Sequence, residues 1–256
     1  MSHDNDVPNP NLVSILPKIN HLRKQTWRPI VGPEEGTLTA SKVSGKPWLN
    51  LNEEWPKCSR CGEPMQLFFQ LNLEQLPEEL EAKFGKGLLQ LFYCITDYYP
   101  NGGMCYELCE SWKPFSEGQL VRVIEPRGEP AVVEVPEIKN RDGYYPTYLI
   151  VDWEKLDDEY PEADELKAYG VEISDENYPG DYDLPKGVNK LAGWPLWLQD
   201  IEYPNCPICN KKMEIVFQIA PDEGSVLEMV PFLSDDVGYI TQCNEHKEQV
   251  AFNWQN

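Results

Sequence analysis

Short apolar runs separated by polar and turn-forming residues recur along most of the chain. Five runs have the length and composition of strands: the continuous runs 65–73 and 88–95, and the more amphipathic runs 119–125, 131–135 and 148–153. Helical spacing of apolar residues is limited to three stretches: residues 11–25, 76–84 and 161–170. The pattern therefore predicts an α+β protein with an N-terminal helix and mainly antiparallel strands, joined by turns rich in the 23 prolines and 17 glycines.

Residues 42–70 match residues 190–218 at a constant offset of 148. Ten of the 29 aligned pairs are identical without a gap: Lys42/Lys190, Gly45/Gly193, Pro47/Pro195, Glu54/Glu202, Pro56/Pro204, Cys58/Cys206, Cys61/Cys209, Met65/Met213, Phe69/Phe217 and Gln70/Gln218. Each copy runs from a loop through a proline-rich turn and a C-x2-C pair into an apolar run. The match predicts an internally duplicated fold, in which two mainly antiparallel β-sheet units pack pseudo-symmetrically.

The repeat and the charge pattern divide the chain into four parts. These are a disordered tail (1–10), an N-terminal half with the first repeat (11–150), an acidic connector (151–186) and a C-terminal half with the second repeat (187–256). The C-terminal half alone is small for a core of its own, so we expect the two halves to share one core.

The second repeat carries the ligand set of a metal site. Cys206 and Cys209 form a C-x2-C pair, and Cys243 and His246 follow as a second pair. Three thiolates and one imidazole in two close pairs suit tetrahedral Zn²⁺. We therefore expect a zinc knuckle here; the alternative is reduced side chains without metal.

The first repeat offers five thiols for four ligand positions. The five are Cys58, Cys61, Cys94, Cys105 and Cys109. Cys105 or Cys109 would be the fourth ligand, and we favour Cys105 because it is nearer to Cys94 along the chain. Asp97 is a weaker candidate; it aligns with His246 when Cys94 is aligned with Cys243, an offset of 149. The sequence thus predicts two structural zinc ions, since four protein ligands leave no open position of the kind that a catalytic zinc keeps.

The chain is strongly acidic, with 43 Asp and Glu against 22 Lys and Arg and a formal net charge of −21. A field of this sign repels nucleic acid and anionic membranes and favours a basic protein partner. No stretch reaches the roughly 20 apolar residues of a membrane span, and the polar N-terminus lacks the apolar core of a secretion signal. We therefore expect a cytoplasmic protein, whose eight cysteines are reduced or bind metal.

Residues 152–183 contain 13 acidic residues and 2 lysines, so their net charge of −11 is about half of the total. One interpretation is a solvated connector. The other is a docking surface for a basic protein, with five candidate residues: Asp157, Asp158, Glu159, Asp164 and Glu165.

No catalytic constellation stands out in the sequence. It has no glycine-rich nucleotide motif, no H-E-x-x-H and only three histidines. A non-catalytic binding protein is therefore the leading interpretation. The alternative is an enzyme or small-ligand binder with a pocket between the two halves, near Trp48, Trp194, Gln70 and Gln218.

The first repeat resembles the YwqG-like family of uncharacterised bacterial proteins. The matching residues are Ser41, Lys42, Gly45, Pro47, Trp55, Pro56, Gln70, Asn72, Gly87, Leu89 and Gln90. The resemblance covers most of residues 12–256 and implies an α+β fold with an internal duplication and no established activity. The cysteines depart from the simplest members of that family, so the zinc prediction rests on their spacing.

A shorter stretch resembles the eukaryotic ribosomal-protein chaperones of the programmed-cell-death-two class, which hold a basic ribosomal protein. The shared pattern is C-x2-C-G-x-P-M…Q, here Cys58, Cys61, Gly62, Pro64, Met65 and Gln70. Together with the acidic charge, the resemblance favours a zinc-stabilised protein-binding module, such as a chaperone or an immunity-type protein for a basic partner.

Overall fold

All ten strands of the computed structural model belong to a single sheet. The structure describes residues 17–32, 36–97, 103–138, 145–171, 185–221 and 236–256. The strands are β1 (Thr26–Gly32), β2 (Lys42–Val43), β3 (Gln66–Asn72), β4 (Leu88–Tyr93), β5 (Gln119–Ile124), β6 (Tyr148–Lys155), β7 (Lys190–Ala192), β8 (Glu214–Ile219), β9 (Val237–Gln242) and β10 (Val250–Gln255). Their order is β10-β9-β8-β7-β1-β6-β2-β3-β4-β5, and every neighbouring pair is antiparallel.

The prediction of an α+β fold with two sheet units is wrong. The helices that lie wholly within the described residues are short: α2 (Cys105–Leu108), α3 (Ala163–Ala168) and the 3-10 turns η1 (Asn20–Leu22) and η2 (Glu78–Leu80). One sheet runs through both halves because β1 pairs with β6, from Trp27 opposite Lys155 to Gly32 opposite Leu149. The protein is therefore mostly β, and this central pair makes the two predicted units one sheet.

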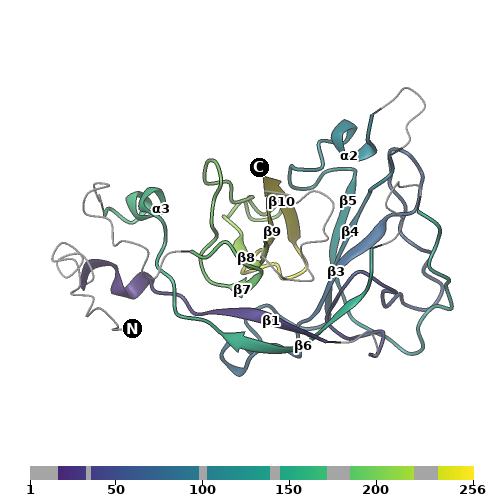
Figure 1. Cartoon of the computed structure of the whole chain (residues 1–256), viewed down its shortest axis with the longest axis horizontal. Coiled ribbons are helices and arrows are strands. Elements are labelled where there is room, and N and C mark those ends of the chain that lie inside the picture. Colours follow the sequence, from purple (N-terminus) through teal and green to yellow (C-terminus); the bar gives the residue numbers. More distant parts are fainter. Residues whose placement is uncertain (1–16, 33–35, 98–102, 139–144, 172–184, 222–235) are drawn as a thin grey trace, which may run out of the picture.

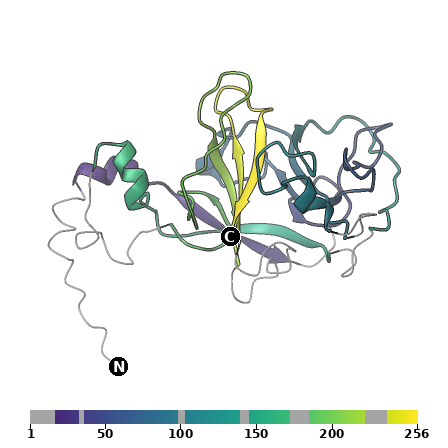
Figure 2. The same cartoon turned by 90° about the horizontal axis from the view of Figure 1, so that it is seen from above.

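The sheet bends into two walls that face each other. In Figure 1, β1 and β6 form the base, and β3–β5 and β7–β10 rise from it; Figure 2 shows the same arrangement from above. The main apolar core contains residues of both walls, including Tyr93 and Phe252, whose rings meet edge to face with centroids 6.1 Å apart. Each half thus buries its apolar face against the other.

Polar contacts join the two outermost strands, β5 and β10. The side-chain amide of Gln119 donates to the carbonyl oxygen of Phe252 at 3.0 Å. The backbone N–H of Trp254 donates to the carbonyl oxygen of Trp112, in the loop before β5, at 3.1 Å. These bonds satisfy edge groups of β10 and nearly close the sheet into a barrel.

The two copies of the repeat fold alike. Lys42 lies opposite Gln70 between β2 and β3, and Lys190 lies opposite Gln218 between β7 and β8. The same shift of register interrupts β3 and β8 at equivalent places. The duplication in the sequence is therefore also a duplication of structure, within one sheet.

Four of the five predicted strands are present, as β3, β4, β5 and β6. The exception is 131–135, which has no strand conformation. Its residue Val132 is 99% exposed, and the neighbouring Pro130 forms an isolated bridge with Asn50. The alternation of apolar residues there thus belongs to a segment without a partner strand, in which Ala131 is buried and Val132 is exposed.

The predicted helices are shorter than expected. The stretch 161–170 contains α3, whereas 76–84 contains only η2. In the N-terminal stretch, residues 17–22 are helical. Residues 11–16 and the tail 1–10 lie outside the described residues.

Candidate metal centres

Two equivalent turns hold the C-x2-C pairs. The N–H of Gly62 donates to the carbonyl oxygen of Cys58 at 2.9 Å, and the N–H of Asn210 donates to that of Cys206 at 2.8 Å. Gly62 and Asn210 have φ angles of 74° and 56°, in the left-handed region that glycine and asparagine adopt most readily. The chain therefore turns tightly enough to bring both sulfurs of each pair to one side.

The third ligand of each group comes from the end of the neighbouring strand. Cys94 directly follows β4, and Cys243 directly follows β9. Because β4 pairs with β3 and β9 pairs with β8, each strand ends beside the turn that precedes its partner. Cys105 begins α2, and His246 lies in the loop after Cys243. In each group the C-x2-C turn thus supplies two ligands, the strand end supplies the third, and the fourth comes from α2 in the first group and from a loop in the second.

The structure brings the predicted ligands together in two groups. In each group, the four ligand atoms lie within 4.8 Å of one another. The groups are Cys58, Cys61, Cys94 and Cys105, and Cys206, Cys209, Cys243 and His246.

Distances within the groups agree with tetrahedral geometry. The sulfur atoms are 3.7 Å apart for Cys58 and Cys105, 3.6 Å for Cys61 and Cys94, and 3.6 Å for Cys209 and Cys243. Metal–sulfur bonds of about 2.3 Å would place sulfurs at the corners of a regular tetrahedron about 3.8 Å apart. The Nδ1 atom of His246 lies 3.8 Å from the sulfur of Cys206 and 3.7 Å from that of Cys243. Both groups therefore fit a tetrahedral metal ion.

Cys105, rather than Cys109 or Asp97, completes the first group. Cys109 caps the C-terminus of α2, and its sulfur lies 3.7 Å from that of Cys105. It is a neighbour of the group rather than a member.

Hydrogen bonds favour the thiolate form at Cys58 in the first group and at Cys206 in the second, whereas the pKa values of Cys94, Cys105 and Cys209 are raised. A hydrogen bond with Cys94 lowers the pKa of Cys58 to about 4. At Cys206, burial raises the pKa, but the N–H groups of Cys209 and Ile208 outweigh it and bring the pKa below its ordinary value. A thiolate beside further thiols is a ligand set prepared for a cation.

Apolar residues surround both groups. The first group packs with Leu49, Trp55, Met65, Leu67 and Phe92, and the second with Met213 and Ala251. Within the first group, Cys58, Cys94 and Cys105 are at most 1% exposed. This burial suits ligands that hold the fold together, since it leaves little room for a substrate.

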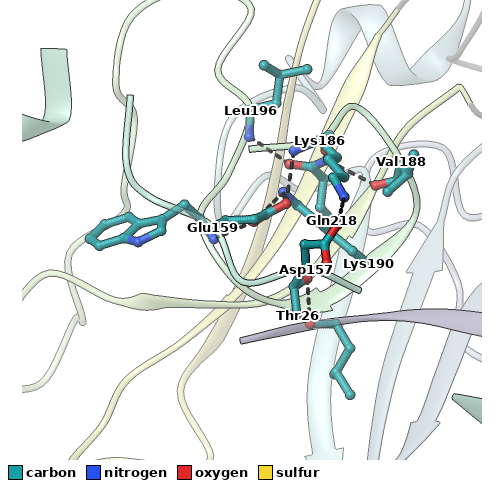
Figure 3. Close-up of polar contacts among 10 residues, drawn as sticks. Thr26, Asp157, Glu159, Lys186, Val188, Lys190, Leu196 and Gln218 are labelled. Atoms are coloured by element: carbon teal, nitrogen blue, oxygen red, sulfur yellow. Dashed lines mark hydrogen bonds and ion pairs between the residues drawn. The ribbon is translucent and has the colours of Figure 1, made fainter. Parts of the chain in front are cut away.

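Two of the five acidic residues predicted to bind a partner are buried. The side chain of Glu159 is completely buried, and its carboxylate accepts a hydrogen bond from the ammonium of Lys190 at 2.7 Å (Figure 3). Glu165 is 1% exposed and accepts a hydrogen bond from the hydroxyl of Tyr203 at 2.6 Å. A buried carboxylate cannot contact a partner, so the prediction is corrected for both. Bonds to neighbouring chain segments draw these two residues of the connector into the fold.

The other three acidic residues lie at the surface. Their side chains are 83%, 28% and 74% exposed and pair with basic neighbours: Asp157 with Lys186, Asp158 with Arg23, and Asp164 with Lys167. Exposed ion pairs of this kind hold their partners weakly. These carboxylates are thus accessible to a basic surface.

The four residues predicted to line a pocket hold loops in place instead. Gln70 and Gln218 are completely buried. The indole N–H of Trp194 donates to the carbonyl oxygen of Leu22 at 2.8 Å, and that of Trp48 donates to the Asn50 side chain. Their polar atoms are therefore used within the fold.

A cleft of about 1050 Å³ lies between the two halves at other residues. Aromatic and acidic side chains line it, among them Tyr106, Trp112, Tyr203, Trp254, Glu107, Glu202 and Asp236. The rings of Trp112 and Trp254 meet edge to face, with centroids 6.3 Å apart. No spacing in the sequence could have indicated this cleft, because its walls come from widely separated segments.

Comparison with known proteins finds relatives without an assigned function. The family model described as "Domain of unknown function (DUF1963)" matches residues 41–229. The uncharacterized protein YpfL of Salmonella typhimurium is 28% identical over 102 residues, which are 39% of this chain. The match covers 21% of YpfL, so this chain spans about a fifth of the length of that curated relative. Within the described residues, every helix is too short or too polar to cross a membrane.

Proposed function

The chain belongs to the DUF1963 family, whose function is unknown, and we propose that it is a non-catalytic protein, stabilised by two zinc ions, that binds a basic protein. The observation that carries the metal part of this proposal is the pair of four-ligand groups built from equivalent turns of the repeat. The protein would then act as a chaperone or an immunity-type protein.

Zinc suits these donors better than other common metals. Four thiolates, or three thiolates and an imidazole, are ligand sets of structural zinc sites, whereas Mg²⁺ and Ca²⁺ prefer oxygen ligands. In both groups the protein supplies all four ligands, which supports a structural ion without a position for a reacting water molecule.

Charge supports the choice of a basic partner. The net charge is −21, and Asp157, Asp158 and Asp164 present accessible carboxylates on one short segment. The likeness to ribosomal-protein chaperones around Cys58 and Cys61 points to the same class of partner, and we keep the YwqG-like assignment as part of the proposal. Eight free cysteines favour a reducing compartment such as the cytoplasm.

Capture from the source cell followed by titration of the purified partner tests the proposal. We expect a basic protein whose affinity falls as salt rises, and falls further in the variant Asp157→Asn/Asp158→Asn/Asp164→Asn. The control is Glu74→Gln/Glu78→Gln/Glu81→Gln, which removes the same charge from exposed residues elsewhere. Binding that is indifferent to salt and to the first variant would overturn the proposal.

The cleft between the halves favours a second candidate, a small-ligand binder. Its volume of about 1050 Å³ and its aromatic walls suit an organic ligand. A metabolite that quenches tryptophan fluorescence in the wild type, but not in Trp112→Phe/Trp254→Phe, would support this candidate.

A further inference from the structure

The carboxylate of Glu159 is surrounded by hydrogen-bond donors at the C-terminal copy of the repeat. Its two carboxylate oxygens lie 2.7 and 2.8 Å from the ammonium of Lys190. One oxygen also accepts the backbone N–H of Lys186 at 2.9 Å, and the other accepts that of Trp194 at 3.1 Å. Figure 3 shows Glu159 lying beside Lys186 and Lys190. The C-terminal copy thus forms a carboxylate site, and Glu159 of the preceding connector fills it.

The N-terminal copy contains the same donors. An offset of 148 places Lys42 at the position of Lys190, and Leu38 and Lys46 at those of Lys186 and Trp194. The loops are also held alike, because Gln70 and Gln218 make equivalent bonds. The side-chain amide of Gln70 donates to the carbonyl oxygens of Leu38 and Ala40 and accepts from the N–H of Trp48. In the other copy, Gln218 donates to the carbonyl oxygens of Lys186 and Val188 and accepts from the N–H of Leu196.

No carboxylate of the described residues takes the place of Glu159 in the N-terminal copy. The ammonium of Lys42 donates instead to the carbonyl oxygens of Thr37, Leu38 and Lys46, at 3.4, 3.2 and 3.0 Å. The N–H groups of Leu38 and Lys46 have no acceptor within the described part of the chain. The ammonium of Lys42 and these two N–H groups therefore correspond to the donors around Glu159, but no carboxylate of the described residues lies among them.

The Lys42 charge is costly where it lies. The residue is 4% exposed, and burial lowers its pKa to about 8, as burial also does for Lys190. Neutral carbonyl oxygens compensate a buried ammonium less well than a carboxylate does. The loop around it is more open than its counterpart: Lys46 is half-buried, whereas Trp194 is 2% exposed.

We propose that the N-terminal copy is a binding site for a carboxylate from outside the chain, held by the ammonium of Lys42 and the backbone N–H groups of Leu38 and Lys46. The carboxylate takes the position that Glu159 has in the other copy. Lys42 then exchanges its carbonyl acceptors for carboxylate oxygens. The site is independent of the proposed basic partner. Its ligand is a small carboxylic acid or the free carboxylate of a peptide.

Amide NMR of the full chain tests the site with an internal control. The zinc-loaded protein is labelled with ¹⁵N-leucine and ¹⁵N-lysine and titrated with sodium acetate against sodium chloride of equal ionic strength. We expect saturable shifts of the Leu38 and Lys46 amides that are several-fold larger than the shift of the Lys186 amide. Shifts that equal the chloride control, or that are alike in both copies, would overturn the proposal.

Variants test the chemistry of the site. Lys42→Met should lose the acetate response while it retains the zinc content and circular dichroism of the wild type. Glu159→Ala should gain an acetate-dependent shift at the Lys186 amide, because it removes the carboxylate that occupies the equivalent donors in the other copy. A response that survives in Lys42→Met would contradict the proposed role of the ammonium, and if that variant fails to fold, the wild-type titration still decides.

Two further arms test whether the site recognises the free carboxylate of a peptide and whether a carboxylate of the chain itself fills it. A short glycine peptide with a free C-terminus should bind, and its amidated form should not. If the amidated peptide binds equally well, the carboxylate is not what the site recognises. If acetate acts only on Glu34→Gln/Glu35→Gln and not on the wild type, a carboxylate of the chain itself fills the site, and the proposal is wrong.

Discussion

The ring of Phe69 packs against the ring of Phe217, with centroids 4.5 Å apart. The two residues are separated by 148 positions and are equivalent members of the repeat. Equivalent residues of two copies can touch only near a pseudo-twofold axis, so this contact locates the axis inside the core. The walls carried by β3 and β8 meet there, and neither half has a separate interior at this point.

The shared core predicts that the two halves unfold together. Phe217→Ala removes a completely buried ring from the axis and should destabilise the whole protein by about 3–5 kcal/mol. Urea unfolding followed by circular dichroism and by zinc release should show one transition for both sites. Two separated transitions, one of them unaffected by Phe217→Ala, would contradict the shared core. Phe115→Ala, at a half-exposed phenylalanine, is the control.

The metal ligands could be predicted from the sequence more accurately than the sheet topology could, for a physical reason. Ligand spacing is local: a C-x2-C turn brings two sulfurs together whatever surrounds it. The pairing of β1 with β6 joins segments far apart in the sequence. In addition, β1 contains Pro29 and its buried positions do not alternate regularly, so its sequence does not show the pattern of a strand. The strands β2 and β7 have only two and three residues, too short to show a period.

Burial of charge was equally hidden in the sequence. Glu159 belongs to a run of acids that reads as a solvated surface, yet it lies in the interior because Lys190 and two backbone N–H groups meet its carboxylate. Only the positions of these partners in space distinguish it from Asp157.

Breaking the Glu159–Lys190 pair should be strongly destabilising. Glu159→Gln keeps the shape of the side chain but leaves the buried ammonium of Lys190 without a counterion, which should cost about 3–5 kcal/mol. Asp157→Asn, at an exposed ion pair with Lys186, should cost less than about 1 kcal/mol. Urea unfolding at pH 7 compares the two; equal effects would mean that the buried pair contributes no more than a surface pair.

Substitution of single cysteines should separate ligands from neighbours. Cys206→Ala and Cys105→Ala should each retain about one zinc ion per chain instead of two, and should lower the melting temperature by more than about 10 °C. Cys109→Ala should retain both ions. Elemental analysis and thermal unfolding measure these outcomes. Loss of an ion from Cys109→Ala with retention in Cys105→Ala would assign the fourth ligand to Cys109.

Glu162 should make the protein less stable as the pH rises. Burial raises its pKa from 4.5 to about 7. The folded state therefore binds the proton more tightly than the unfolded state, so the contribution of Glu162 is complete below pH 4.5 and is lost as the pH approaches 7. Glu162→Gln stays neutral and should be more stable than the wild type by on the order of 1 kcal/mol at pH 8, after allowance for solvent screening, and equally stable at pH 4. Urea unfolding at both pH values measures the difference, with Glu154→Gln, an exposed carboxylate, as the control. A gain that is the same at both pH values would trace the effect to packing rather than to the charge of the carboxylate.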